Sequence, residues 1–99
     1  MKKKLSQKKI FEEIKRNKKE IKKFHVKRIG LFGSFIKKKQ TKRSDVDFLV
    51  EFNKVSFDNY MNLLILLKEL FNRKIDLVIE RDLRPELEYV KSEVQYVKL

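Results

Sequence analysis

Apolar and polar positions along the chain follow two spacings, one typical of helices and one typical of strands. Near the N-terminus, apolar side chains recur roughly every three to four residues with lysine and glutamate between them, which predicts a helix over residues 7–23. A second helix is predicted over residues 57–72, with Ser56 as its N-cap. Short apolar runs bounded by turn residues predict strands over residues 26–32, 46–52 and 75–79.

The remaining segments complete an α/β pattern. A short helical turn is expected after Ser34, where the first strand ends. Pro85 suits the first turn of a final helix, because its missing N–H is tolerated there, and Tyr96 with Val97 can form a short last strand. Elements in this order predict an α/β fold with a small mixed β-sheet flanked by helices, in a single domain over residues 1–99.

The predicted helix over residues 57–72 is apolar on nearly all sides, which is typical of a helix buried on more than one face. Four of its side chains are assigned to the core: Tyr60, Leu64, Leu67 and Phe71. Three further leucines exceed what so small a domain can cover, and they predict a protein-binding surface: Leu63, Leu66 and Leu70.

The chain is strongly basic, with a formal net charge of +12 at pH 7. Residues 1–28 hold thirteen lysines and arginines against three glutamates, and residues 37–43 hold five more basic residues without an acid. Such a surface can attract phosphates or an acidic partner. The 20 lysines against 6 arginines, with no alanine, are equally typical of coding bias, so most of this charge is expected to face solvent, with residues 37–43 as the exception.

Two absences narrow the class of protein. The sequence has no cysteine, which excludes a disulfide framework and a thiolate metal site. No run approaches the roughly 18 apolar residues of a membrane span, and the lysine-rich N-terminus lacks the apolar stretch of a signal peptide. A cytoplasmic protein is expected.

The most specific chemistry lies between the first two predicted strands. Gly33 and Ser34 end the first strand, and after a spacer of ten residues Asp45 and Asp47 enter the second. Side chains two residues apart on a strand project from the same face, so both carboxylates face the glycine turn. Mg²⁺ prefers such oxygen ligands and completes its coordination shell with water and substrate phosphates. The pattern therefore predicts a site for a phosphate-bound magnesium ion.

Ordinary structural roles could explain parts of this pattern. Serine and aspartate favour turns, and Gly33 with Ser34 could be a strand end followed by a helix cap. Asp76 is harder to explain in this way, because it lies between apolar residues of the third strand, where an ionised aspartate is rare without a partner. A metal shared with Asp45 and Asp47 would supply that partner, so the metal site is the favoured interpretation.

These motifs resemble the nucleotidyltransferase superfamily of DNA polymerase β type, and more narrowly its minimal members, the MNT proteins. The resemblance covers the chain from about residue 10 onward and is carried by residues 31–35, 44–50 and 74–79. It implies a polymerase β-like nucleotidyltransferase fold. It also implies a magnesium-dependent enzyme, with ATP as the nucleotide donor.

The resemblance further implies roles for individual residues. Asp45 and Asp47 are expected to hold two Mg²⁺ ions. Asp76 is expected to complete the ion nearer the attacking hydroxyl and to accept the proton of that hydroxyl, so that all three aspartates are catalytic and metal-binding. The nucleotide is expected to contact Gly33, Ser34, Lys37 and Ser44.

The sequence departs from the family pattern directly after the glycine turn. Minimal members usually follow Gly-Ser-Phe with Ala-Arg-Gly, whereas this chain has Ile36, Lys37 and Lys38. Lys37 keeps the charge of the usual arginine but loses its planar fork, and Lys38 replaces a flexible glycine. Catalytic efficiency and nucleotide preference are the properties that this change is expected to affect.

Minimal nucleotidyltransferases of this kind commonly pair with a HEPN-domain ribonuclease toxin. The resemblance therefore implies an antitoxin that transfers AMP from ATP to a tyrosine hydroxyl of that toxin. One alternative is transfer to RNA, whose phosphates the basic segments would follow, or to a small molecule such as an aminoglycoside. Another is a non-catalytic antitoxin that binds its partner and blocks it, although the three aspartates favour catalysis.

Overall fold

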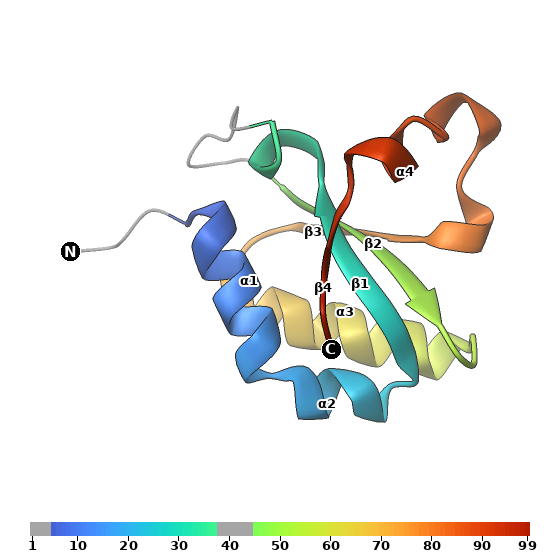
Figure 1. Ribbon diagram of the computed structural model, residues 1–99. Helices are drawn as coiled ribbons and strands as arrows, with labels where there is room; N and C mark the ends of the chain where they lie inside the picture. Colours follow the sequence, from blue (N-terminus) through green and yellow to red (C-terminus); the bar gives the residue numbers. More distant parts are fainter. Residues whose placement is uncertain (1–4, 38–44) are drawn as a thin grey trace.

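A mixed sheet of four strands forms the centre of the molecule in a computed structural model, which describes residues 5–37 and 45–99 (Figure 1). The strands are β1 (Val26–Phe32), β2 (Val46–Phe52), β3 (Ile75–Ile79) and β4 (Gln95–Val97). They lie in the order β3-β2-β1-β4, with β2 parallel to β3 and β1 antiparallel to both β2 and β4. The predicted strands and the mixed sheet are thereby confirmed.

Three helices cover one face of this sheet, and the segment that follows β3, which contains the short helix α4, covers part of the other (Figure 1). The helices are α1 (Gln7–Arg16), α2 (Lys18–Lys23), α3 (Phe57–Phe71) and α4 (Val90–Glu93). Single 3-10 turns lie at Gly33–Phe35, Glu80–Asp82 and Pro85–Leu87. Within the described part of the chain, no helix is both long and apolar enough to cross a membrane.

The main core lies between the sheet and helices α1, α2 and α3. Alternate residues of the central strands point into it, and Ile29, Leu31, Phe48 and Val50 are all fully buried. Leu49 points to the opposite face, where it is buried in a second cluster under the segment that follows β3. Because β2 packs apolar residues on both faces, it is the most enclosed strand of the sheet.

The predicted N-terminal helix over residues 7–23 is interrupted at Asn17, so the prediction of one continuous helix is wrong. Asn17 leaves the helical region, with φ −104° and ψ 17°. Its side-chain amide donates a hydrogen bond of 2.8 Å to the carbonyl oxygen of Glu13. The backbone N–H of Asn17 is shared between the carbonyl oxygens of Glu13 and Ile14. An asparagine side chain that competes for helical carbonyls in this way breaks the helix into α1 and α2.

Helix α3 begins as predicted, because the hydroxyl of Ser56 accepts a hydrogen bond from the N–H of Asn59 at 3.0 Å. Its burial differs from the prediction. Leu63 belongs to the core and is fully buried, so its assignment to a docking surface is wrong. The apolar side chains that α3 exposes most are instead Phe57 and Ile65. Leu66 and Leu70 are partly buried against the core.

The predicted final helix after Pro85 is also wrong in its extent. The chain forms the turn Pro85–Leu87 and then the single-turn helix α4, instead of one helix. Tertiary packing explains the difference, because Leu83 and Val90 are both drawn onto Leu49 on the second face of the sheet. A continuous helix could not place both of them there. The short last strand is confirmed as β4.

Gly30 allows the C-terminal segment to approach β1 closely. A Cβ atom on Gly30 would lie 2.5 Å from Cγ2 of Val94 and 2.9 Å from Cδ1 of Tyr96. Both distances are far shorter than van der Waals contact between carbon atoms. The missing side chain therefore leaves room for the side chains of Val94 and Tyr96 to pack over β1.

We expect Gly30→Ala to lower the free energy of unfolding by about 1–3 kcal/mol, because overpacking outweighs the gain in backbone entropy. Chemical denaturation measures this change. The double variant with Val94→Ala removes the nearest atom, so its loss should be smaller than the sum of the two single losses. A strictly additive result would contradict the packing explanation.

Candidate active site

The pairing of strands brings residues of the sequence motif together on the second face of the sheet. In the register of β2 with β3, Asp47 pairs with Asp76. In the register of β1 with β2, Asp47 pairs with Phe32, so Gly33 follows directly beside it. Asp45 lies one residue before β2, and its negative charge is close enough to raise the pKa of Asp47. Residues far apart in the sequence thus meet at one end of the sheet.

Gly33 is required by its backbone and by its neighbour. Its φ of 76° lies in the left-handed region, which glycine adopts without strain. A Cβ atom on Gly33 would collide with Oδ2 of Asp47. The carbonyl oxygen of Gly33 accepts hydrogen bonds from the N–H groups of Ile36 at 3.1 Å and Lys37 at 3.0 Å. Ser34, the second residue of this 3-10 turn, is partly exposed.

The carboxylate of Asp47 carries the strongest electrostatic perturbation of the site. Burial, together with the negative charges of Asp76 and Asp45, raises its pKa from 3.8 to about 6, and burial is the largest of these causes. Desolvation and like charges both disfavour the ionised form. Asp47 is therefore the residue at which burial and the charges of its two neighbours act together.

Asp76 is exposed to solvent, which corrects the expectation drawn from its apolar neighbours. Ile75 and Leu77 on either side point into the core and are buried, whereas Asp76 points to the second face. Strand β3 lies at the edge of the sheet, so this face is open beside it. Because Asp76 is exposed, its charge is solvated and does not require a buried partner. Its link to the site is its place beside Asp47.

The carboxylates fit a magnesium ion by their chemistry. Among residues 5–37 and 45–99, no three carboxylate or imidazole groups are close enough together to form a complete metal site. Mg²⁺ needs only one or two protein carboxylates when substrate phosphates supply further oxygen ligands. Because Gly33 has no side chain, the carboxylate of Asp47 can lie directly against the glycine turn. The donor set thus suits an ion that arrives together with a nucleotide.

A pocket of about 320 Å³ opens over these residues. Its lining includes Gly33, Asp47 and Asp76, together with Lys37 and Glu93. The ammonium of Lys37 lies 3.5 Å from Oε2 of Glu93. Ser34 follows the lining residue Gly33, and Asp45 lies two residues before Asp47, but neither Ser34 nor Asp45 lines the pocket. The predicted nucleotide-binding residue Ser44, like Lys38, lies outside the described residues.

The sequence motif did not indicate the apolar wall of this pocket. The wall comes mainly from the segment that follows β3 and includes Leu83, Leu87, Tyr89 and Val90. In the sequence, these residues have the spacing of an ordinary packing stripe. Only the turns of this segment bring them over the carboxylates, and no local signal marks those turns.

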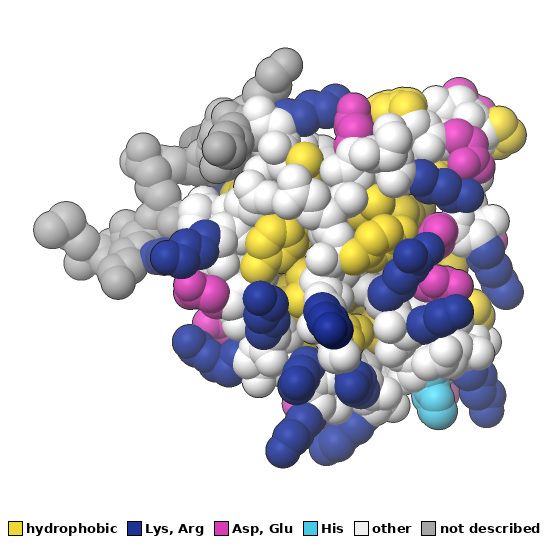
Figure 2. Space-filling view, in the orientation of Figure 1, with side chains coloured by type: hydrophobic (Ala, Val, Ile, Leu, Met, Phe, Trp, Pro, Cys, Tyr) yellow, Lys and Arg dark blue, Asp and Glu magenta, His cyan; other side chains and the backbone are white. Residues whose placement is uncertain are grey.

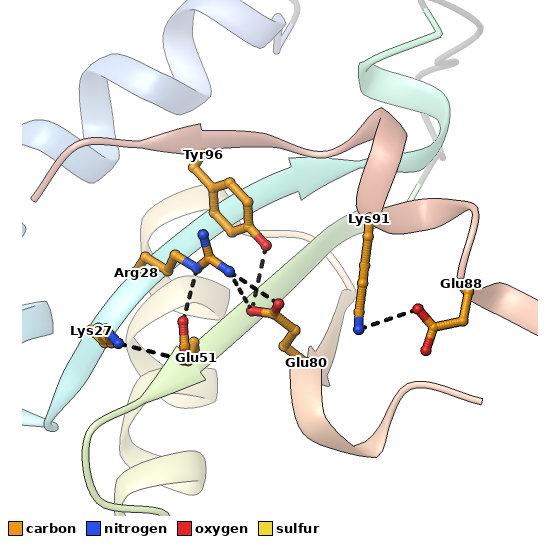
Figure 3. Close-up of polar contacts among 7 residues, drawn as sticks. All are labelled: Lys27, Arg28, Glu51, Glu80, Glu88, Lys91 and Tyr96. Atoms are coloured by element: carbon orange, nitrogen blue, oxygen red, sulfur yellow. Dashed lines mark hydrogen bonds and ion pairs between the residues drawn. The ribbon is translucent and has the colours of Figure 1, made fainter. Parts of the chain in front are cut away.

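An ionic network fastens the beginning of this segment to the sheet (Figure 3). Nε of Arg28 lies 2.8 Å from Oε1 of Glu51, and its terminal nitrogen lies 3.0 Å from Oε1 of Glu80. The guanidinium of Arg28 also lies 4.2 Å from the ring centroid of Tyr96. The hydroxyl of Tyr96 donates a long hydrogen bond of 3.4 Å to Glu80. Glu80, at which the segment starts, thus has partners on β1 and β4, and Arg28 links it to Glu51 of β2.

Lysine and arginine side chains cover the outside of the helical layer. In Figure 2 they gather over the part of the face that α2 occupies in Figure 1. Several are half or more exposed even where they form ion pairs, such as Arg16 with Glu13 and Lys23 with Glu20. Exposed pairs of this kind contribute little to stability. The basic helices therefore have the solvated faces that the sequence predicts.

Comparison with protein families places this arrangement among known proteins. The family model for polymerase beta nucleotidyltransferases matches residues 8–94. A protein of Methanocaldococcus jannaschii described provisionally as a protein adenylyltransferase is 37% identical over 90 residues, which cover 87% of this chain and 88% of that protein. The protein adenylyltransferase MntA of Thermococcus cleftensis is 36% identical over 84 residues, covering 82% and 85% of the two chains.

Solved structures agree in fold. A structure described provisionally as a minimal nucleotidyltransferase has a TM-score of 0.79 at 25% identity, covering 92% of this chain and 95% of its own. A toxin–antitoxin structure with AMP-PNP has a TM-score of 0.66 at 23% identity, covering 93% and 72%. A complex of a tri-AMPylated Shewanella oneidensis HEPN toxin with an MNT antitoxin has a TM-score of 0.55 at 21% identity, covering 83% and 69%. The last two likenesses concern the fold alone.

The raised pKa of Asp47 predicts a specific pH dependence of stability when no metal is present. The proton of Asp47 is held more tightly in the folded protein than in the unfolded chain, so ionisation opposes folding. As pH rises from about 4 to about 6, the wild-type protein should lose on the order of 2 kcal/mol of unfolding free energy relative to Asp47→Asn. Above about pH 6 the difference should stay constant.

Urea denaturation in EDTA at several pH values measures this difference. Asp82→Asn is the matched control, because Asp82 is exposed in the turn Glu80–Asp82, does not line the pocket and is not among the charges that shift the pKa of Asp47. Its difference from wild type should change little over the same range. A pH-independent difference for Asp47→Asn would refute the electrostatic description of the site.

Proposed function

The chain belongs to the polymerase beta nucleotidyltransferase family, and we propose that it transfers AMP from ATP to a tyrosine hydroxyl of a partner HEPN ribonuclease toxin, which it neutralises. Proteins named as adenylyltransferases are its relatives over most of their length. The neighbour with an AMPylated HEPN toxin supports the choice of acceptor. The reaction would take place in the cytoplasm, where ATP is available.

The observation that carries this proposal is the register of Asp47 with Asp76, next to a glycine turn against which the carboxylate of Asp47 lies directly. Asp45 and Asp47 would hold the magnesium that the triphosphate brings. Gly33 and Ser34 would approach its phosphates with backbone N–H groups and a hydroxyl. Lys37 would supply positive charge from the other side of the pocket.

The chemistry needs an acceptor oxygen in line with the leaving pyrophosphate. The tyrosine oxygen attacks the α-phosphorus, a new P–O bond forms, and the bond to pyrophosphate breaks. Bound magnesium would supply charge stabilisation of the attacking and leaving oxygens. Asp76 takes the proton of the tyrosine hydroxyl. Its exposure at the edge strand β3 leaves room for a hydroxyl that another protein presents.

The whole proposal predicts a covalent product. Incubation of the chain with its co-expressed HEPN partner, ATP and Mg²⁺ should add the mass of one or more AMP groups to tyrosine residues of the partner. EDTA should abolish the addition, because the triphosphate then lacks its ion. Intact-protein and peptide mass spectrometry measure both results. A complex that forms without any added AMP would favour a steric antitoxin and contradict the enzymatic proposal.

Asp76→Asn should separate nucleotide binding from transfer. Asp45 and Asp47 hold the ion of Mg·ATP in this proposal, whereas Asp76 acts on the acceptor. The variant should therefore keep its affinity for Mg·ATP within about threefold and lose at least about a hundredfold in transfer rate, as expected for loss of a general base.

Calorimetry and single-turnover transfer measure the two properties on the same samples. Asp47→Asn is the contrasting variant and should lose both binding and transfer. Wild-type transfer by Asp76→Asn would remove Asp76 from the catalytic group and leave the pair Asp45–Asp47.

A further inference from the structure

The segment between β3 and β4 leaves two large apolar side chains uncovered directly beside the carboxylates. Leu87 is 37% exposed and Tyr89 is 53% exposed, yet both line the pocket that contains Asp47 and Asp76. Their neighbours Leu83 and Val90 are buried against Leu49. The segment thus packs part of its apolar surface on the sheet and turns the rest toward the pocket.

This wall is held in place at both of its ends. Glu80, at its beginning, is paired with Arg28 of β1 at 3.0 Å. Val94, at its end, approaches Gly30 of the same strand so closely that no Cβ fits between them. Leu87 and Tyr89 lie between these two attachments. An apolar surface that is anchored but uncovered is suited to a flat ligand that enters the pocket.

The pocket is lined by two chemically different groups of residues. Gly33, Asp47 and Asp76 are suited to phosphates and their ion, whereas Leu87 and Tyr89 are apolar and belong to the segment that follows β3. A nucleoside triphosphate has the same division, because its phosphates are charged and its base is a flat aromatic ring. The volume of about 320 Å³ lies at the lower end of the range for small-molecule sites.

Among the residues that the structure describes, the face of the Tyr89 ring has only a weak contact, with the ammonium of Lys37. The ammonium of Lys37 lies 5.9 Å from the ring centroid, at the outer limit of a cation–π contact. The same ammonium lies 3.5 Å from Glu93, so it has a second partner when the ring face is taken. A base can therefore reach Tyr89 without leaving Lys37 uncompensated.

We propose that Leu87 and Tyr89 form the nucleobase site of this enzyme, and that the site selects purines over pyrimidines without distinguishing adenine from guanine. The proposal rests on the proposed nucleotidyl transfer, and it assigns contacts to the base of the nucleotide, for which the sequence motif provides none. Stacking uses the face that every base possesses, and a purine offers the larger face. An apolar wall forms no hydrogen bonds with the edge of a base, so adenine and guanine nucleotides should bind with similar affinity.

The test compares affinities for Mg·ATP, Mg·GTP, Mg·CTP and Mg·tripolyphosphate, the last of which carries no base. The full chain should bind ATP and GTP within about threefold of each other and CTP about tenfold more weakly. Tyr89→Leu should lower the affinity for Mg·ATP about tenfold and leave the affinity for Mg·tripolyphosphate unchanged. Tyr89→Phe should bind both ligands with wild-type affinity. Isothermal titration calorimetry measures all four ligands.

Phe57→Leu is the matched control, because Phe57 is an exposed aromatic residue on α3, on the other side of the sheet. It should change none of the affinities. Leu87→Asn should, like Tyr89→Leu, lower the affinity for Mg·ATP and not that for Mg·tripolyphosphate. It provides the test if Tyr89→Leu is less well folded. Equal weakening of ATP and tripolyphosphate, or none in either variant, would overturn the nucleobase site.

The two proposals fail in different ways. Wild-type protein that binds neither Mg·ATP nor Mg·tripolyphosphate would contradict the nucleotidyltransferase function itself. If the wild-type protein transfers AMP but Tyr89→Leu and Leu87→Asn bind ATP with wild-type affinity, only the proposed nucleobase site is contradicted. A clear preference for ATP over GTP would show that hydrogen bonds read the base edge and would overturn the proposed selectivity.

Discussion

The parallel register of β2 with β3 is the constraint on which the site depends. Phe48 pairs with Leu77 in this register, and both are buried in the main core. The residues before them, Asp47 and Asp76, consequently pair with each other on the opposite face. A slip of one residue would turn one of these strands over and bury a carboxylate among the helices. The hydrophobic core therefore fixes the placement of the carboxylates, although none of them belongs to it.

This placement opposes folding in the absence of a ligand. Asp47 is partly buried beside two other carboxylates, and its raised pKa records the unfavourable energy of the charged form. The fold tolerates this because the rest of β2 is enclosed on both faces, with Phe48, Leu49 and Val50 fully buried. Stability is thus concentrated in the strand that carries the repelling charges. Such a division is expected at sites that bind a cation only together with its substrate.

The sequence predicts the strands and the motif well, because both depend on local patterns. Alternation and turn residues define β1, β2 and β3, and the spacing of Gly33 from Asp45 and Asp47 follows from them. Properties that depend on tertiary contacts are not predicted from the sequence. Asp76 is exposed because β3 is an edge strand, and the apolar residues around Asp76 do not indicate the strand order. The break at Asn17 is decided by a side chain that competes for one carbonyl oxygen.

Strand β1 connects the two ends of the proposed nucleotide site. It continues into the turn at Gly33, and it also carries Arg28 and Gly30, to which the segment around Leu87 and Tyr89 is attached. The distance between the phosphate turn and the apolar wall is therefore set by one rigid strand instead of by two independent loops. A nucleotide held at its base would have its α-phosphate positioned relative to Asp47 and Asp76 by that same strand. Positioning of this kind supplies a large part of the rate of a displacement reaction, and here it follows from which residues of β1 face the second side of the sheet.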